Sequence, residues 1–138
     1  MRYYLDTNII IFILTLDKDN IDSEVSIILK DYSTLLYASS VAIMELLLLY
    51  RIGKLKLKSA KSETDILEKL EKYNIEIKLF NQSHFQQYSK LIISDKHKDM
   101  NDHAIIAQAI SDRVPLISSD RDFKNYVSQG LEFVYNKR

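Results

Sequence analysis

Apolar residues along this chain follow two alternating patterns. Short runs that are apolar or alternate with polar residues predict strands, at residues 1–5, 35–38, 75–80, 114–117 and 131–135. Segments with apolar residues every three or four positions predict helices, at residues 9–15, 21–31, 41–50, 57–73, 83–94, 102–110 and 122–127. Strands that alternate with helices predict an α/β fold with a mainly parallel sheet. A length of 138 residues suits one domain, which we expect to span residues 1–138.

Four acidic residues occupy positions where an acid is a poor choice for folding alone. Asp6 and Asp120 each follow an apolar strand, and Glu45 lies inside a helix that is otherwise apolar on every side. Asp102 shares a face with the apolar stripe of its own helix. In a parallel sheet, the carboxyl ends of the strands and the starts of the following helices share one edge. Because the four acids map to that edge, we expect them to converge.

Carboxylates gathered in this way predict a cation site. Burial of an ionised carboxylate costs free energy, and neighbouring carboxylates raise that cost unless a proton or a cation compensates. Carboxylate oxygens are ligands that Mg²⁺ and Mn²⁺ prefer. One such cation can activate water for attack on phosphorus, while the same cation or a second one stabilises the leaving oxygen. The pattern therefore predicts metal-dependent hydrolysis of phosphodiester bonds, with the number of metal ions left open.

Two of these positions have simpler explanations. The polar turn at residues 6–8 can serve only to cap the following helix. Glu45 can be structural if Arg51 or another cation neutralises it. The apolar helix around Glu45 also predicts burial, either within the domain or against a partner protein.

The remaining two acids have alternatives as well. Asp102 can be favoured by the dipole of the helix that it begins, although this does not require a place on the apolar stripe. Asp122 competes with Asp120 for the fourth position, because a Ser-Asp-Arg-Asp segment after a strand is an ordinary way to begin a helix. The sequence leaves this choice open.

Other kinds of site lack support. The histidines do not have the spacing of a zinc site, and we expect them on the surface or behind the metal ligands; they are His84, His97 and His103. The serines lack a histidine base and an orienting acid at interpretable positions, and the chain has no glycine-rich phosphate loop. The lysines between residues 54 and 61 can contact RNA phosphates, but a solvated face is the simpler reading.

Composition limits both the kinds of site that this chain can form and the cellular location that we expect. The chain has no cysteine, which excludes disulfides, zinc–thiolate sites and thiol nucleophiles. The formal net charge is zero, so any polyanion site must be local. The apolar run at residues 41–50 is too short to span a membrane, and Asp6 interrupts the opening run before it becomes a signal peptide. We expect a cytoplasmic protein with no membrane association.

Four ordered motifs contain the four acids. They are YLDTN at residues 4–8, SSVAIMEL at residues 39–46, DMNDHAIIAQA at residues 99–109 and SSDRDF at residues 118–123. These motifs resemble those of the PIN-domain ribonucleases, and specifically the VapC-like toxins of type II toxin–antitoxin systems, with RIGKL at residues 51–55 as in one subgroup. The resemblance runs almost end to end. The chain departs at His103, where Arg is frequent, and at Ser118, where Thr is usual. These differences concern substrate contacts and local geometry rather than the carboxylates.

The resemblance implies a PIN-like three-layer α/β/α sandwich and a Mg²⁺- or Mn²⁺-dependent endoribonuclease. It implies that the catalytic and metal-binding acids are Asp6, Glu45, Asp102 and Asp120, with Asp6 and Asp102 most directly on the metal. Neighbours that can support them are Asn8, Asp99, Ser118 and Asp122. It also implies an RNA substrate, a homodimer, and a cognate antitoxin whose tail covers the active site.

Other functions remain open at this point. A housekeeping RNA-processing PIN nuclease would have the same motifs, and a small antitoxin reading frame immediately upstream would favour the toxin. A noncatalytic protein-binding PIN module would keep the apolar surface without using the acids. Two other α/β classes with clustered acids fit the sequence less well. A receiver domain normally has two adjacent early acids, where this chain has Asp-Thr-Asn at residues 6–8. A haloacid-dehalogenase-like phosphatase needs a second Asp at the position of Asn8.

Overall fold

The computed structural model describes residues 1–94 and 96–138. Its strands form one sheet in the order β3-β2-β1-β4-β5, and every neighbouring pair is parallel. The strands are β1 (Arg2–Leu5), β2 (Leu35–Ser39), β3 (Ile75–Lys78), β4 (Leu116–Ser118) and β5 (Phe133–Tyr135). The parallel sheet predicted from the sequence is therefore confirmed.

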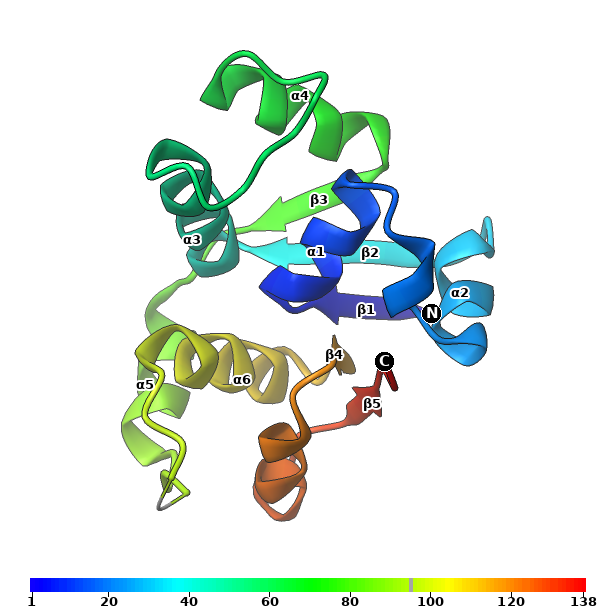
Figure 1. Ribbon diagram of the computed structural model, residues 1–138. Helices are drawn as coiled ribbons and strands as arrows, with labels where there is room; N and C mark the ends of the chain where they lie inside the picture. Colours follow the sequence, from blue (N-terminus) through cyan, green and yellow to red (C-terminus); the bar gives the residue numbers. More distant parts are fainter. Residues whose placement is uncertain (95) are drawn as a thin grey trace.

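Helices connect the strands throughout the described part of the chain (Figure 1). The α-helices are α1 (Thr7–Leu14), α2 (Ser23–Lys30), α3 (Ser40–Arg51), α4 (Glu63–Lys72), α5 (Gln82–Lys90) and α6 (Met100–Asp112). The 3₁₀ helices are η1 (Lys18–Asn20) and η2 (Arg121–Gln129). Within the described residues, no helix combines the length and the apolar character that crossing a membrane requires.

The strand order reverses direction at β1. The chain steps from β1 to β2 to β3 on one side, then returns past β1 to β4 and β5 on the other. Because parallel crossovers are right-handed, this reversal places the two sets of helices on opposite faces of the sheet. On one side α1 packs against α3 and α3 against α4, and on the other α6 packs against both α5 and η2. The result is the α/β/α sandwich that the motifs imply.

The reversal also locates a binding crevice. In open parallel sheets, ligands bind beyond the carboxyl ends of the strands where the strand order reverses. Here that point lies between β1 and β4, which pair through Tyr4 with Leu116 and Leu5 with Ile117. Tyr4 and Leu5 at the end of β1 and all three residues of β4 are buried, as expected for parallel strands that helices cover on both faces.

The helix predicted at residues 57–73 is wrong in its first turns, because α4 begins at Glu63. Ser62 caps this helix by accepting the N–H of Asp65. Before it, Leu55 and Leu57 are buried in the core from an irregular segment. The apolar positions in that segment therefore reflect core packing without helical structure.

The helix predicted at residues 83–94 ends earlier, at Lys90. Leu91 turns to an extended conformation and is buried. Beyond it, the backbone N–H and C=O of Ile92 bond to the side chain of Gln129, and the N–H of Ser94 bonds to the hydroxyl of Tyr126. Side chains from η2 thus replace the helical hydrogen bonds.

Smaller differences concern the ends of other elements, which local patterns place least well. Strand β3 stops before residues 79 and 80, and β4 and β5 begin two residues later than predicted. Helix α1 begins two residues earlier than predicted, at Thr7, and α6 begins at Met100, so that Asp102 lies in its first turn. Helix α2 is shorter at both ends, and η2 is a longer 3₁₀ helix than the segment predicted there.

Helix α3 is not fully buried within the domain, contrary to one of the two readings of its apolar sequence. Met44 is 71% exposed, Leu48 is 50% exposed and Ile52, which follows the helix, is 54% exposed. Ala42, Ile43 and Leu46 face the core instead. The outer side of α3 is therefore an apolar stripe at the surface.

A network of side-chain hydrogen bonds joins β1 to α5 and α6. The hydroxyl of Tyr4 donates to Asp112 and accepts from the side chain of Gln108 at 3.1 Å. His84 Nε2 lies 2.8 Å from Asp112, while its Nδ1 accepts the N–H of Asn81 and completes the cap of α5. His84 is 2% exposed, so placing it on the surface was wrong. The network holds the end of α6 against the strand that leads to Asp6.

The network makes Tyr4 a test of how α6 is anchored. Tyr4→Phe removes the donor to Asp112 and the acceptor for Gln108, so we expect it to lower the free energy of unfolding by about 1 to 3 kcal/mol. Urea denaturation measures this change, and Tyr32→Phe at a fully exposed tyrosine is the matched control. Equal stability of the two variants would contradict a structural role for the network.

Candidate active site

Asp6 stands at the junction of β1 and α1. It is the N-cap of α1, and its Oδ1 accepts the N–H of Thr7 at 2.8 Å. Its Oδ2 accepts the hydroxyl of Ser118, at the end of β4, at 2.7 Å. Asp6 is 5% exposed, so a carboxylate is held almost out of water at the point where the strand order reverses.

Ser118 connects Asp6 to the fourth acid. Its hydroxyl oxygen accepts the N–H of Asp120 at 3.0 Å while the hydroxyl donates to Asp6. Asp120 is half-buried and caps η2 by accepting the N–H of Asp122 at 2.9 Å. Asp122 is exposed, and its backbone rather than its carboxylate contacts Asp120. Of the two competing residues, Asp120 is the one beside the other acids.

Glu45 reaches the same region from α3. Its Oε2 accepts the side-chain N–H of Asn101, in the first turn of α6, at 3.1 Å. Arg51, the cation that could have neutralised it, instead pairs with Glu63 at 2.7 Å. The structural explanation through Arg51 is therefore wrong, and Glu45 is half-buried with an amide partner.

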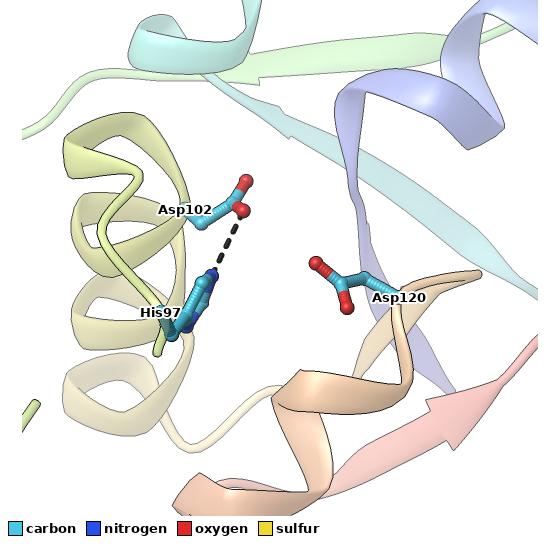
Figure 2. Close-up of side chains that lie close together, drawn as sticks. All are labelled: His97, Asp102 and Asp120. Carbon is cyan, nitrogen blue, oxygen red and sulfur yellow. Dashed lines mark hydrogen bonds and ion pairs between the residues drawn. The ribbon is translucent and has the colours of Figure 1, made fainter. Parts of the chain in front are cut away.

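Asp102 projects from the first turn of α6. The preceding Asp99 caps this helix by accepting the N–H groups of Asn101 and Asp102. The carboxylate of Asp102 meets His97, whose Nε2 lies 3.0 Å from Oδ2. Figure 2 shows this pair with Asp120 facing it from the start of η2. Ligand atoms of His97, Asp102 and Asp120 lie within 4.8 Å of one another.

These side chains line one cleft of about 320 Å³. Its lining consists of Asp6, Thr7, Asn8, Glu45, Leu49, Asp99, Asp102 and Asp120. The four acids singled out from the sequence therefore share a cleft, together with Asn8 and Asp99. Ser118 lies behind Asp6 and Asp120, bonded to both. Asp122 is not part of the lining described.

The carboxylates that line the cleft repel one another when they are ionised. Burial, together with the charge of Asp102, raises the pKa of Asp6 from 3.8 to about 7, although the hydrogen bonds from Ser118 and Thr7 act in the opposite direction. Burial, together with the charges of Asp99 and Asp120, raises the pKa of Asp102 to about 6, although the hydrogen bond from His97 acts in the opposite direction. Without a positive charge, the ionised cluster is costly.

The donor set fits a hard divalent cation. Carboxylate oxygens from β1, α3, α6 and η2 or their ends converge on the cleft, which is the oxygen-rich environment that Mg²⁺ and Mn²⁺ prefer. The hydroxyl oxygen of Thr7, 3% exposed, has no hydrogen-bond partner within the described residues and lies on a residue lining the same cleft. A bound cation would neutralise the carboxylate charges, and its water molecules would give the Thr7 hydroxyl a hydrogen-bond partner.

Sequence reasoning missed the placement of two histidines. His97 and His103 are both buried, so neither lies on the surface. His97 takes the other place that we expected for a histidine, behind the proposed metal ligand Asp102, and His103 takes neither. His97 stands in a polar segment between helices, so no apolar pattern marks it as a core residue. Its partner Tyr126 lies 29 positions away. Nothing in the local sequence could have connected them.

Comparisons with known proteins agree with this geometry. A family model described as the PIN domain matches residues 3–128. The VapBC2 structure from Rickettsia felis, bound to a DNA fragment from its promoter, has 22% identity and a TM-score of 0.67, covering 99% of this chain and 100% of that one. VapBC-5 from Mycobacterium tuberculosis has 23% identity and a TM-score of 0.61, covering 97% and 98%.

A third similar structure is the DNA-bound VapBC from Salmonella typhimurium, with 17% identity and a TM-score of 0.65, covering 98% of each chain. No curated protein sequence shows a significant match to this chain. At these identities the structural similarities establish the fold.

The raised pKa of Asp6 links stability to pH in the absence of metal. The folded protein keeps a proton on Asp6 that the unfolded chain releases, so stability falls as pH rises between 3.8 and about 7. Asp6→Asn has no charge to bury. With chelator at pH 8, we expect this variant to gain on the order of 1 to 3 kcal/mol in the free energy of unfolding.

Urea denaturation at pH 4 and at pH 8 measures the effect, which should nearly vanish at pH 4. Asp19→Asn, at an exposed aspartate in η1, is the matched control and should show no such difference. An Asp6→Asn variant destabilised equally at both pH values would mean that lost hydrogen bonds outweigh the relief of charge.

Proposed function

This chain belongs to the PIN domain family, and we propose that it is a metal-dependent endoribonuclease, the toxin of a toxin–antitoxin pair. One observation carries the proposal. Acids from four separate places in the sequence line one cleft at the reversal of the strand order, and two of them have raised pKa values in the absence of a cation. Metal binding explains why the fold maintains this arrangement.

The cation would be held by Asp6 and Asp102, with Glu45 and Asp120 completing the carboxylate set. When bound, Mg²⁺ or Mn²⁺ would supply a positive charge that lowers the pKa of water and neutralises the phosphate. Ser118 fixes the orientation of Asp6 through its donated hydrogen bond. Asn101 holds one oxygen of Glu45 and leaves Oε1 without a partner among the described residues, so Oε1 is the oxygen that can complete the carboxylate set or assist in removing a proton from the attacking water.

RNA is the substrate that the four motifs imply. The acidic cleft is lined by few apolar groups, so it suits a charged backbone bridged by a cation rather than an apolar ligand. We propose a cytoplasmic location for this activity. The similarity to structures of VapBC toxin–antitoxin systems supports a cognate antitoxin as a partner. The motif resemblance further implies that a tail of this antitoxin covers the cleft.

A homodimer is supported by the outer side of α3. Met44, Leu48 and Ile52 form an exposed stripe at four-residue spacing, which suits packing against the same stripe of a second copy. The stripe adjoins an apolar cleft of about 470 Å³ whose lining includes Met44, Phe85 and Met100. Exposed apolar surface of this kind favours a protein partner.

The nuclease proposal is tested on a total small-RNA pool with Mg²⁺, Mn²⁺ or chelator. We expect discrete cleavage by wild type with metal and none with chelator. Asp6→Asn and Asp102→Asn should each lower the cleavage rate by about 100- to 1,000-fold, the usual effect of removing one electrostatic group at a reacting centre. Rates are read from the disappearance of individual RNAs on denaturing gels.

The same assay tests whether Asp120 or Asp122 is the fourth catalytic acid. Asp120→Asn should lower the rate as the other variants do, whereas Asp122→Asn should retain most of it because only the backbone of Asp122 contacts Asp120. Asp19→Asn controls for the loss of a surface charge. Cleavage that survives Asp6→Asn and Asp102→Asn would contradict the proposed site and favour a noncatalytic module with a contaminating nuclease.

The dimer proposal is tested with Leu48→Lys, which places a charge in the centre of the α3 stripe. We expect the mass in solution to fall from a dimer to the 16.2 kDa monomer. Light scattering after gel filtration measures the mass. Ile27→Lys replaces an exposed isoleucine on α2, which lies at the opposite side of the molecule from α3 (Figure 1), and it should leave the dimer intact. A wild-type monomer at high concentration would exclude this interface.

A further inference from the structure

We propose that His97 is a positioning residue, which holds one oxygen of Asp102 through its Nε2–H so that the other oxygen is available to a divalent cation. This inference rests on the proposed metal-dependent function. It adds a residue from outside the four acidic motifs, in the segment between α5 and α6. The close-up in Figure 2 shows the imidazole ring directed at Asp102.

We assign the hydrogens of His97 from a chain of hydrogen bonds. The backbone N–H of Ser94 donates to the hydroxyl oxygen of Tyr126 at 3.2 Å, so the Tyr126 hydroxyl is free to donate its own hydrogen. His97 Nδ1 lies 2.9 Å from that hydroxyl. In the direction that satisfies every group, Tyr126 donates to Nδ1 and His97 Nε2–H donates to Asp102 Oδ2.

This arrangement argues against His97 as a metal ligand. A nitrogen that binds a cation must offer a lone pair, but Nε2 faces an ionised carboxylate at 3.0 Å and must carry hydrogen there. Nδ1 is occupied by Tyr126. The closeness of His97 to Asp120 therefore reflects its support of Asp102 from behind rather than a direct place on the cation.

The ring is held rigidly enough to direct the carboxylate. His97 is 5% exposed and packs against His103, Phe123 and Tyr126, with ring centroids 4.8, 5.7 and 5.5 Å away. His103 Nε2 also lies 2.8 Å from the backbone carbonyl oxygen of His97. Both the side chain and the backbone are thus fixed from neighbouring elements.

Asp102 needs such support because its neighbours repel it. The charges of Asp99 and Asp120 act on its carboxylate, which has only one side-chain hydrogen-bond donor among the described residues. Hydrogen-bond partners behind metal ligands orient them, and their loss typically weakens metal affinity by roughly 10- to 100-fold. Without His97, the carboxylate would lose its preferred orientation.

The test compares two substitutions with opposite properties. Phe keeps the ring packing of His97 but has no donor, whereas Gln keeps an N–H donor but no ring. We expect His97→Phe to weaken Mn²⁺ binding by roughly 10- to 100-fold and His97→Gln to retain most of the affinity. Electron paramagnetic resonance of free Mn²⁺ measures the affinity directly, and urea denaturation shows whether each variant is folded.

His84→Phe is the matched control. His84 is also buried and also pairs with an aspartate, Asp112 at 2.8 Å, but its partner does not line the acidic cleft. This variant should lose stability without losing Mn²⁺ affinity. An equal loss of affinity in His84→Phe and His97→Phe would mean that both act only through stability, which would overturn the inference.

Other outcomes separate this inference from the proposed function. If His97→Phe binds Mn²⁺ with wild-type affinity, whether or not His97→Gln does, then His97 has only a packing role. The proposed metal site would be unaffected by that result. Imidazole nitrogen coupling in the electron spin echo of bound Mn²⁺ would make His97 a ligand and overturn its positioning role. A wild-type protein that binds no Mn²⁺ would overturn the metal site and this inference together.

Discussion

The free energy cost of placing carboxylates beside one another, largely out of water, is the constraint on which this structure depends. Asp6 is almost fully buried, and burial together with the charge of Asp102 favours its protonated form. A fold selected for stability alone would not maintain such a cluster. Its presence at the reversal of the strand order, where parallel sheets bind ligands, makes a cation the natural compensation.

The fold limits that cost by giving each acid a donor from its surroundings. Asp6 receives the hydroxyl of Ser118, Glu45 receives an amide N–H from α6, and Asp120 receives a backbone N–H from η2. Asp102 is the acid whose partner is a histidine from outside the motifs. Because these donors belong to different elements, the geometry of the cleft depends on how the two layers of helices meet across the carboxyl edge of the sheet.

Helix α3 has two distinct sides, which resolves an ambiguity in its sequence. Its inner side carries Leu46 into the core, and Glu45 reaches the acidic cleft. Its outer side leaves Met44 and Leu48 in solvent. One helix thus connects the chemistry of the cleft with a surface suited to a partner, so that association at α3 would bring a second copy close to the acids.

The sequence alone determined the features that depend on neighbouring residues. The spacing of apolar residues predicted the strands and the parallel α/β architecture, and acids at the ends of apolar runs directed attention to Asp6, Glu45, Asp102 and Asp120. The tertiary structure decided what depends on distant contacts: that Asp120 rather than Asp122 lines the cleft, that part of α3 stays exposed, and that His97 reaches Asp102 while Tyr126 holds its other nitrogen. The physical reason is that helix and strand periodicity and capping are local, whereas burial and hydrogen-bond partners are set by segments that meet only when the chain folds.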